Sequence, residues 1–587
     1  MRAGILAAGM AVCLAGTASG VRAPIVLDGA FGDWDGLAPA AVDPSGDGAG
    51  SIDLGRLWCA DDDRFLFIRF EVGPAEVQLD SGNDLVLYLD TDLDGATGRA
   101  IGGIGAELEW RFGARRGTFY NGARETPIRH ADIRFIAAPS VTSTTFEMAI
   151  ARDARPDGVH PLFTGSRVRI LLMDGASGDR EPNSGEVLTY TFDEGTLPPE
   201  TQIPIARASA GDLRVTTHNV HNDGPWDAAK EPGFRRQYAA LAPGILNFQE
   251  IYDHSAPETA ALVETWLPSG QGQTRYGAGV SGHDCITVSR YPVEGIWPID
   301  GNMAVLLNTS AALGTKLLIV NAHLPCCTDD PGRQREVDHI LSFIRDAGEP
   351  GGVLPANTPV VIVGDLNLVG LSRQLKSLLT GDILDNATYG PDFHPDWDGS
   401  DLADLISRQT ERRVAFTWQS EGGDYWPGRL DFLIATGSVL ETANHFVLYT
   451  PEMSADSLAA HGLLAHDSLS SDHLILTADF RASGSADSTG AGTPAAIQAR
   501  LVPNPSRGTV ELRLELPREA AVLVEICDPA GRRVAYPAGP AWVAVQAGEM
   551  RLSWDGRDDP AGAYFVRVRV RDLSGENART VKWLSVR

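Results

Sequence analysis

Hydrophobic and polar residues alternate in short runs in the first and last parts of the chain. This period-two pattern is found at residues 65–70, 85–89, 168–172, 510–516, 522–526 and 564–570. Gly- and Asp-containing turns bound the runs, which is typical of antiparallel strands. We therefore predict a β-sandwich over residues 23–194 and a smaller one over residues 497–587.

The central part of the chain instead alternates strand patterns with helical ones. Strands are predicted at residues 213–219, 316–322 and 359–364, and helices at 256–266 and 333–347. The second helix places Val337, Ile340, Leu341 and Ile344 on one face. This order predicts an α/β domain over residues 211–481, in which two packed sheets are covered by helices.

Two segments of different composition separate these blocks. The first predicted linker covers residues 195–210, of which 195–204 are rich in Pro and Thr. The second covers residues 482–496 and is rich in Ser, Gly and Ala, as flexible linkers are. The length of 587 residues fits three or four domains. The chain is therefore predicted to be a multidomain protein.

Polar residues follow the apolar strands of the central block, where strand ends can assemble a site. They are Asn219, Glu250, His323, Asp365, Asn367, Asp431, Asp472 and His473. Any one of them alone is more often a turn former or a helix cap. Their number within one block is what indicates a shared site.

Together with Ser-Arg-Tyr-Pro at 289–292, these positions read Asn, Gln-Glu, Ser-Arg-Tyr-Pro, His, Gly-Asp-x-Asn, Arg-x-Asp and Ser-Asp-His. The series resembles that of the endonuclease/exonuclease/phosphatase (DNase I-like) family and covers nearly the whole central block. The family includes nucleases, apurinic endonucleases, sphingomyelinases and inositol phosphatases. The resemblance implies a four-layer α/β sandwich that hydrolyses phosphodiester bonds by in-line attack of water.

The resemblance also implies a divalent metal ion. Mg²⁺ or Mn²⁺ would be held by Asn219, Glu250 and Asp472, and it would offset the negative charge of the phosphate. One position departs from the pattern of some family members, which carry an acid two residues after the Asn. Here that residue is His221, so the resemblance leaves one metal or two open.

The remaining roles follow from the same resemblance. His473 would be the general base, oriented by Asp431, since a carboxylate partner raises the basicity of an imidazole. Asp365 and Asn367 would position the nucleophile and the phosphate. His323 would donate to a phosphate oxygen or protonate the leaving group.

The N-terminal block resembles carbohydrate-binding family 9-like modules, through Leu-Asp-Gly-Ala-Phe-Gly-Asp-Trp at 27–34 and the segment 90–98. The resemblance implies a glycan partner. In the second segment, Asp90, Asp92 and Asp94 precede Gly95 and could converge on Ca²⁺, or form a solvated turn. The twelfth position is Ile101 rather than Glu, so this is not a complete EF-hand.

The C-terminal block resembles FlgD-like immunoglobulin folds and type IX secretion sorting domains. The motifs are Pro-Asn-Pro-Ser at 503–506, Asp-Pro-Ala-Gly-Arg-Arg-Val at 528–534 and Trp-Asp-Gly-Arg-Asp at 554–558. The resemblance implies export through a type IX secretion machinery. A plain spacer domain is the alternative.

The first 20 residues are typical of a secretory signal peptide, with Arg2 followed by a short apolar run and small residues. No later segment is long and apolar enough to cross a bilayer. We therefore expect a secreted or cell-surface protein. Five cysteines would remain after cleavage, too few for a disulfide scaffold, although Cys326 and Cys327 could form a bridge that stiffens their loop.

The formal net charge is −28, so the chain as a whole lacks the excess of Lys and Arg expected of a protein whose affinity comes from binding nucleic-acid phosphates. A local groove or a bound metal can offset this acidity. The favoured function is thus a secreted, metal-dependent phosphoesterase acting on DNA or RNA, a phospholipid or a small phosphate ester. Nuclease activity ranks ahead of a sphingomyelinase-like or inositol-phosphate-type activity, and an inactive surface adhesion protein is the second alternative.

Overall fold

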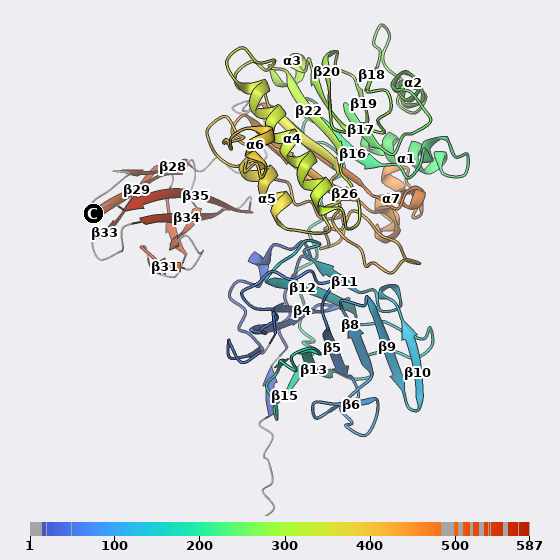
Figure 1. Cartoon of the computed structure of the whole chain (residues 1–587), viewed down its shortest axis with the longest axis vertical. Coiled ribbons are helices and arrows are strands. Elements are labelled where there is room, and N and C mark those ends of the chain that lie inside the picture. The colour runs from blue at the N-terminus through green and yellow to red at the C-terminus, as the bar shows by residue number, and fades with distance from the viewer. Residues whose placement is uncertain are drawn as a thin grey trace, which may run out of the picture. The chain divides into compact units, whose positions relative to one another are not determined.

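The computed structural model describes residues 15–18, 20–48, 50–482, 498–502, 509–516, 520–527, 533–537, 539, 542–546, 548–555, 562–572 and 575–585. Most of the predicted signal peptide (1–14 and 19) and most of the second predicted linker (483–496) lie outside these ranges, as do the C-terminal motif residues 503–506, 528–532 and 556–558. The chain divides into two compact units, residues 1–485 and 486–587. The first unit contains both the N-terminal and the central sheets (Figure 1).

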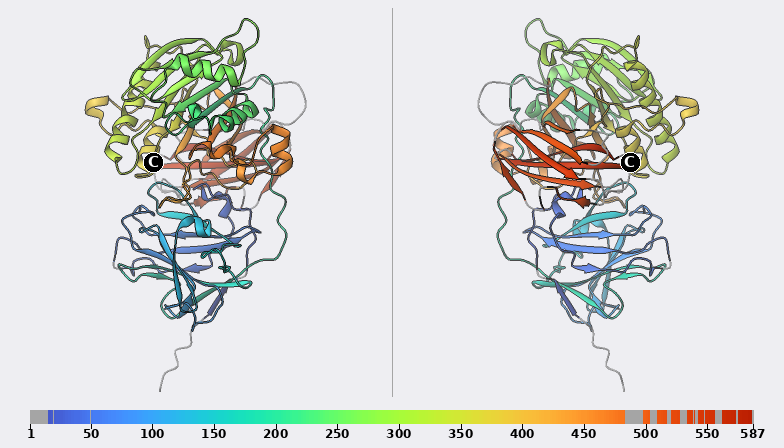
Figure 2. Two further views of the ribbon diagram at one scale, coloured as in Figure 1. Left: turned by 90° about the vertical axis from the view of Figure 1, so that its right-hand side faces the viewer. Right: turned by 90° about the vertical axis from the view of Figure 1, so that its left-hand side faces the viewer.

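The N-terminal region is built from strands in two main sheets (Figure 2). The larger sheet follows the order β1 (Ala15–Ala18), β15 (Val187–Thr191), β13 (Arg167–Asp174), β5 (Leu85–Asp90), β8 (Leu108–Arg111), β9 (Arg116–Asn121) and β10 (Arg124–Ile128), and β14 (Arg180–Glu181) pairs with β13. The smaller sheet follows the order β11 (Ile136–Ala138), β12 (Thr145–Ala151), β4 (Phe65–Glu71), β3 (Arg56–Asp61) and β2 (Ala41–Val42). Three short elements complete the region: η1 (Phe31–Trp34), η2 (His130–Ile133) and the hairpin of β6 (Arg99–Ile101) and β7 (Ile104–Ala106).

The central region contains two six-stranded sheets. The first follows the order β18 (Tyr276–Gly279), β19 (Ile286–Ser289), β17 (Ile245–Gln249), β16 (Leu213–Asn219), β27 (Ile475–Ala482) and β26 (Leu440–Leu448). The second follows the order β20 (Val293–Ile299), β21 (Asn302–Leu307), β22 (Leu317–His323), β23 (Val360–Asp365), β25 (Asp431–Ala435) and β24 (Ala403–Asp404). Val215 and Ile245 from the first sheet share one buried cluster with Val361 and Leu433 from the second, so the sheets pack face to face.

Helices cover the outer faces of both central sheets. α1 (Glu231–Leu241) and α2 (Ala256–Trp266) bury Tyr238 and Trp266 against the first sheet. α4 (Asp330–Gly348) and α5 (Arg373–Thr380) cover the second sheet, where Val337 and Leu341 lie in one cluster with Val320. The remaining short helices are α3 (Ser310–Leu313), α6 (Asn386–Tyr389), α7 (Ala455–His461), η3 (Gly224–Trp226), η4 (Thr450–Glu452) and η5 (Asp467–Ser470). The central region is therefore a four-layer α/β sandwich.

The predicted elements of this region have clear local causes. β23 reads Val-Val-Ile-Val-Gly-Asp and is fully buried, as expected for a strand inside a covered sheet. The Asp329 side chain accepts the backbone N–H of Gly332 at 2.9 Å and caps α4. Ser255 and Glu258 form a reciprocal capping box that starts α2.

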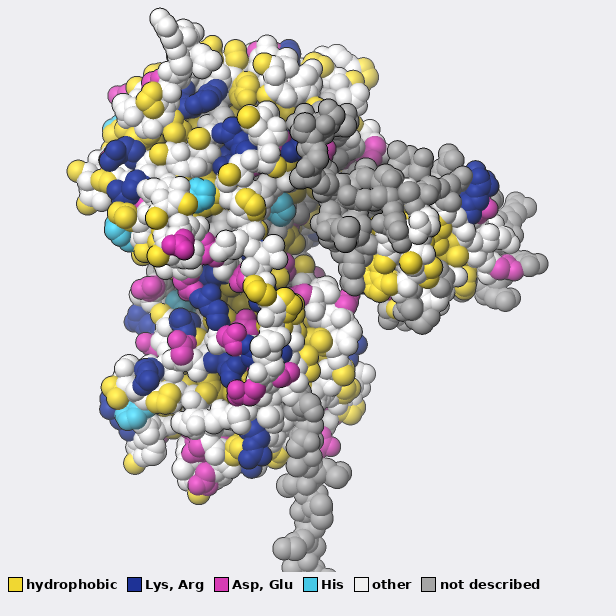
Figure 3. Space-filling model, turned by 180° about the vertical axis from the view of Figure 1, so that it is seen from behind, with side chains coloured by type: hydrophobic (Ala, Val, Ile, Leu, Met, Phe, Trp, Pro, Cys, Tyr) yellow, Lys and Arg dark blue, Asp and Glu magenta, His cyan; other side chains and the backbone are white. Residues whose placement is uncertain are grey.

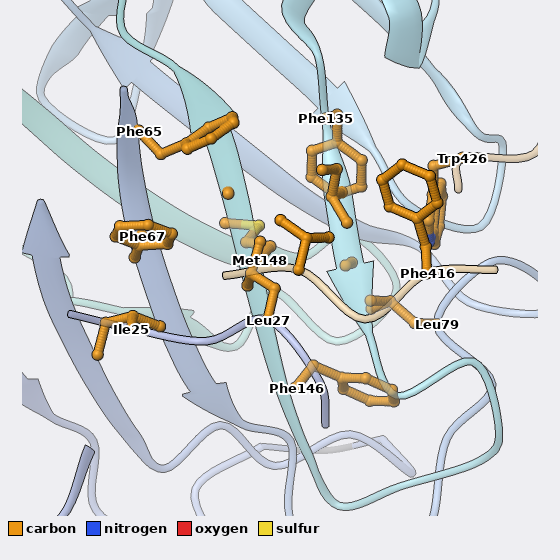
Figure 4. Packing of buried hydrophobic residues seen from close by; sticks show 14 of the residues in the cluster. Ile25, Leu27, Phe65, Phe67, Leu79, Phe135, Phe146, Met148, Phe416 and Trp426 are labelled. Atoms are coloured by element: carbon orange, nitrogen blue, oxygen red, sulfur yellow. The ribbon is translucent and has the colours of Figure 1, made fainter. Parts of the chain in front are cut away.

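Aromatic side chains of the central region lie within the core of the N-terminal sandwich (Figure 4). The Trp426 ring centroid is 5.2 Å from that of Phe135 and 6.4 Å from that of Trp110. Phe416 belongs to the same buried cluster, which also contains Leu27. Because burying such rings stabilises a contact strongly, the two regions form one compact unit.

The C-terminal unit is all-β in its described residues. One sheet follows the order β28 (Gln498–Val502), β29 (Thr509–Leu516) and β33 (Gly548–Asp555). The other follows the order β31 (Arg533–Ala535), β30 (Ala520–Cys527), β34 (Gly562–Asp572) and β35 (Gly575–Ser585), and β32 (Val543–Val545) pairs with β30. Leu512 and Leu514 from the first sheet and Val524 and Val568 from the second share one buried cluster.

A buried ion pair joins two central strands, and its loss is expected to destabilise the first unit. The Arg214 guanidinium donates to both carboxylate oxygens of Asp479 at 2.7 Å, and both side chains are almost fully buried. Asp479→Ala leaves an unpaired buried cation and should lower the free energy of unfolding by about 3–5 kcal/mol. Asp153→Ala removes the exposed pair with Arg134 and should cost under about 1 kcal/mol. Urea denaturation of both variants measures the difference, and equal effects would contradict the prediction.

Candidate active site

Strand register brings three of the predicted site residues together. In the second central sheet, His323 pairs with Asp365 across β22 and β23, and Asp365 pairs with Asp431 across β23 and β25. In the first sheet, Asn219 ends β16 beside the last residue of β17, which Glu250 follows directly. Polar side chains at the strand ends of both facing sheets therefore lie close together, as the hydrogen bond from Asn219 to Asp365 shows.

His473 and Asp431 form a buried pair. The Nδ1 atom of His473 lies 2.8 Å from Oδ2 of Asp431, and its Nε2 lies 3.5 Å from Oδ2 of Asp365. Burial alone would lower the pKa of His473, but the carboxylates of Asp431 and Asp365 outweigh it and raise the pKa to about 10. Burial raises the pKa of Asp431. The pair therefore orients one ring nitrogen of His473 toward Asp365.

A second pair, His323 with Asp284, mirrors the first. The Nδ1 atom of His323 lies 2.5 Å from Oδ2 of Asp284, and its Nε2 lies 3.6 Å from Oδ2 of Asp365. Burial opposes protonation here too, but the bond to Asp284 and the nearby Asp365 raise the pKa of His323 to about 9. The sequence interpretation missed Asp284, because one Asp in the turn before β19 has no pattern of its own. Only the folded structure identifies Asp284 as a site residue, because its carboxylate contacts His323 there.

Asn219 links the carboxylates of the two sheets. Its amide nitrogen donates to Oε1 of Glu250 at 3.0 Å and to Oδ2 of Asp365 at 3.1 Å. The backbone N–H of Asn222 donates to Oε2 of Glu250 at 2.9 Å. Glu250 has a positive φ of 63°, which few residues other than glycine adopt and which is common at functional sites.

Asn367 follows Asp365 by two residues, in the turn after β23. Its backbone N–H donates to Oδ1 of Asp365 at 3.0 Å, and its amide nitrogen donates to the carbonyl of Leu324 at 3.0 Å. It also contacts Oδ2 of Asp365 at 3.2 Å and has a φ of 47°. Within this structure Asn367 holds Asp365 in place, and its predicted contact with phosphate stays a prediction.

Asp472 lies at the exposed side of the site. Its Oδ1 atom is 2.9 Å from Nδ1 of His221, and its Oδ2 accepts the Trp418 indole N–H at 3.1 Å. Ser471 joins it to Asn219, since the Ser471 hydroxyl donates to the Asn219 carbonyl at 2.8 Å. His221, the position that departs from the family pattern, is therefore a partner of Asp472.

The donors present suit a hard divalent cation. Atoms of Asp365, Asp431 and His473 lie within 4.8 Å of one another, and Oδ1 of Asp431 is buried without a hydrogen-bond partner. Glu250 and Asp472 add carboxylate oxygens, the donors that Mg²⁺ and Mn²⁺ prefer. Because Oδ2 of Asp431 already accepts from His473, this pair suits proton transfer better than metal binding. Glu250, Asn219 and Asp472 remain the residues proposed to hold the metal.

The predicted calcium turn is arranged differently from the expected trio. Asp94 accepts the N–H of Ala96 at 3.0 Å, whereas the carboxylate that joins Asp90 and Asp92 is that of Glu107. Oδ2 of Asp90 is already paired with Arg169 at 3.0 Å. Sequence spacing did not predict Glu107, because this residue lies between β7 and β8, outside the segment 90–98.

Residues of the segment 27–34, which resembles the start of carbohydrate-binding modules, have structural roles. Trp34 is 1% exposed, and its indole N–H donates to Glu147 at 2.8 Å. Glu147 also accepts the N–H groups of Asp28 and Gly29. Trp34 is therefore buried in the sandwich, and glycan binding by this region stays a prediction.

The five described cysteines are free thiols. Cys326 and Cys327 are exposed free thiols, so the loop-stiffening disulfide predicted at these positions is not formed in this structure. None of the described helices is long and apolar enough to cross a membrane.

The fold and site thus define a four-layer α/β sandwich with two Asp–His pairs at the ends of its facing sheets. The sequence matches no family model and no curated protein. Among solved structures, the chain is similar to ANGEL2, a 2′,3′-cyclic phosphatase in complex with adenosine-2′,3′-vanadate, at 14% identity over 49% of this chain and 99% of that chain (TM-score 0.31). It is also similar to the AP endonuclease LMAP from Leishmania major, at 12% identity over 48% of this chain and 93% of that chain (TM-score 0.26).

A third similarity, to dimeric latent PorU from Porphyromonas gingivalis, has 10% identity and covers 89% of this chain and 31% of that chain (TM-score 0.15). All three TM-scores lie below 0.35. These similarities establish neither activity nor substrate. The geometry of the site is what supports a function.

Proposed function

We propose that the central region is a divalent-metal-dependent phosphoesterase. The observation that carries the proposal is the convergence of two imidazoles on one carboxylate: Nε2 of His473 and Nε2 of His323 lie 3.5 and 3.6 Å from Oδ2 of Asp365. Each imidazole is oriented by its own carboxylate, and Glu250 lies across Asn219 from Asp365. A site of this composition can accept one proton and donate another around a phosphate group.

The roles of the side chains follow from their surroundings. Asp431 orients His473, whose Nε2 would take a proton from the attacking water once the ring is neutral, while Asp365 holds that water. Because the pKa of His473 is about 10, the ring becomes mostly neutral only at alkaline pH. His323 has a pKa of about 9 and carries a proton at neutral pH, so its Nε2 donates to a phosphate oxygen or to the leaving group. Mg²⁺ or Mn²⁺ held by Glu250, Asn219 and Asp472 supplies positive charge that offsets the phosphate oxygens.

The substrate is proposed to be a nucleic acid, with a phospholipid or a small phosphate ester as the alternatives. On the face shown in Figure 3, Lys and Arg side chains lie scattered among Asp and Glu, and the described residues form no single extended basic stripe there. Tyr252, two residues after Glu250, is 56% exposed and could stack on a base or sugar. Secretion, glycan binding and use of a type IX machinery belong to the same proposal.

A panel assay tests this proposal. The full chain would be incubated with Mg²⁺, Mn²⁺ or EDTA and with plasmid DNA, RNA, sphingomyelin, inositol phosphates and bis-p-nitrophenyl phosphate. We expect hydrolysis of at least one phosphodiester that EDTA abolishes. Hydrolysis of none of them with either metal, by folded protein, would overturn the proposal and favour a binding protein.

Asp431→Asn is expected to change the pH dependence of that activity. The neutral form of His473 accepts the proton, so kcat/KM should rise with pH until the ring is deprotonated. Removing the Asp431 charge lowers the pKa of His473, which shifts the rising limb to lower pH and also lowers the plateau, because the ring loses its orienting partner. A pH–rate profile of both proteins measures this, and an unchanged limb would show that His473 is not the base.

A further inference from the structure

A group of four acidic side chains lies in the N-terminal sandwich, outside the candidate active site. Asp43 directly follows β2 of the smaller sheet, and Asp179 and Glu181 belong to the hairpin that carries β14 of the larger sheet. Carboxylate oxygens of Asp43, Asp47 and Asp179 lie within 4.8 Å of one another. The group therefore places like charges close together where loops of the two sheets meet.

Among the described residues, none donates a hydrogen bond to the carboxylate of Asp43. Its side chain is 5% exposed, and both of its carboxylate oxygens are buried without a hydrogen-bond partner. Glu181 is 2% exposed, and its Oε2 is likewise without a partner. An unpaired buried carboxylate costs several kcal/mol, so native proteins pair such groups with a cation or a donor.

No Lys or Arg of the described chain forms an ion pair with any of the four. Arg180 lies between Asp179 and Glu181, but its guanidinium donates to the carbonyls of Pro182 and Gly102. Burial and the neighbouring carboxylates raise the pKa of Asp43 to about 7. Among the described residues, the charges that act on Asp43 and Glu181 are all negative.

Backbone contacts hold the surrounding loop in a defined shape. The Asp53 carboxylate accepts the N–H of Gly46 at 2.9 Å, and Oδ2 of Asp179 accepts the N–H of Leu54 at 2.8 Å. A Cβ on Gly48 would lie 2.9 Å from Oδ2 of Asp179 and 3.0 Å from the carbonyl of Ile52. The loop approaches the acidic group closely and leaves no space for a side chain at Gly48.

We propose that Asp43, Asp47, Asp179 and Glu181 form a binding site for a divalent cation of the calcium type, which joins the two sheets of the N-terminal sandwich. Only oxygen donors are present, and Ca²⁺ accepts six to eight of them in flexible geometry, so it suits a carboxylate cluster on a loop better than Mg²⁺ does. This site is separate from the metal proposed for catalysis. It also differs from the Asp90 turn, where Arg169 already neutralises one carboxylate.

Calcium titration of the full chain tests the proposal. After chelation, the protein would be titrated with CaCl₂ by calorimetry, and its unfolding temperature would be measured with and without Ca²⁺. We expect Ca²⁺ to raise the unfolding temperature by about 3 °C at a concentration 100 times Kd, because the compact unit that holds the site spans residues 1–485. Asp43→Asn should abolish most of this shift. Without Ca²⁺, the same variant should be at least as stable as the unaltered protein, because it loses a like-charge contact.

Two control variants separate this site from the others. Asp92→Asn alters the second acidic cluster, and Glu250→Gln alters the proposed catalytic metal site, so both should keep the calcium-dependent shift. If Asp43→Asn keeps the full shift, or if Ca²⁺ produces no shift in the unaltered protein, the proposal is overturned. An Asp43→Asn protein that is less stable than the unaltered protein even without Ca²⁺ would also contradict it.

Discussion

His473→Ala is expected to reduce kcat/KM for phosphodiester hydrolysis by about 10²–10⁴-fold, the usual contribution of a positioned general base. The Nε2 atom of His473 is the ring nitrogen that faces Asp365, and the other nitrogen is held by Asp431 at 2.8 Å. Alanine removes the proton acceptor and leaves Asp431 buried without its partner. Steady-state kinetics on the best substrate of the panel measures the loss.

The control for this variant is His461→Ala, which changes a histidine at the end of α7 that none of the described contacts links to the site. It should retain nearly full activity. Circular dichroism must show that His473→Ala is folded, because the pair with Asp431 is buried. A folded His473→Ala protein with more than about a tenth of the original activity would rule out the proposed base.

Glu250→Gln is expected to give the second large effect, through the metal requirement. The glutamine keeps the size of the side chain and one carbonyl oxygen but removes the negative charge that a divalent cation requires. We expect activity to fall about 10²-fold or more at a fixed Mn²⁺ concentration and to be partly recovered at higher Mn²⁺. Activity measured against Mn²⁺ concentration separates weaker metal binding from a slower chemical step.

Glu349→Gln is the matched control, since Glu349 is exposed at the end of α4. It should show the Mn²⁺ dependence of the unaltered protein. If Glu250→Gln also keeps that dependence unchanged, the metal is held elsewhere, and the cluster of Asp365, Asp431 and His473 becomes the better candidate.

The sequence pattern predicted the central elements closely. The predicted strand at 213–219 and the predicted helix at 256–266 coincide with β16 and α2, and the start of α2 is marked locally by the capping box of Ser255 and Glu258. The predicted helix at 333–347 is α4, which begins three residues earlier, at Asp330, directly after its cap Asp329. Period and capping are local properties, so they can be read from neighbouring residues.

Contacts between distant segments were not predictable in this way. Asp284 reaches His323 across 39 residues, and Glu107 rather than Asp94 joins Asp90 and Asp92. Trp426 enters the core of the N-terminal sandwich beside Phe135, although the sequence pattern divides these regions into separate blocks. Such contacts depend on how sheets pack, and packing depends on the whole chain.

The kind and order of the elements, and the positions of polar residues at strand ends, therefore follow from local sequence patterns. Apolar periodicity and turn residues decide these locally, which is why Asn219, His323 and Asp365 were found without a structure. Which of these side chains contact one another depends on strand register and on the packing of two sheets face to face, and both involve residues far apart in the sequence. The same packing enclosed the uncompensated Asp43, whose significance lies in its burial and which the sequence pattern did not indicate.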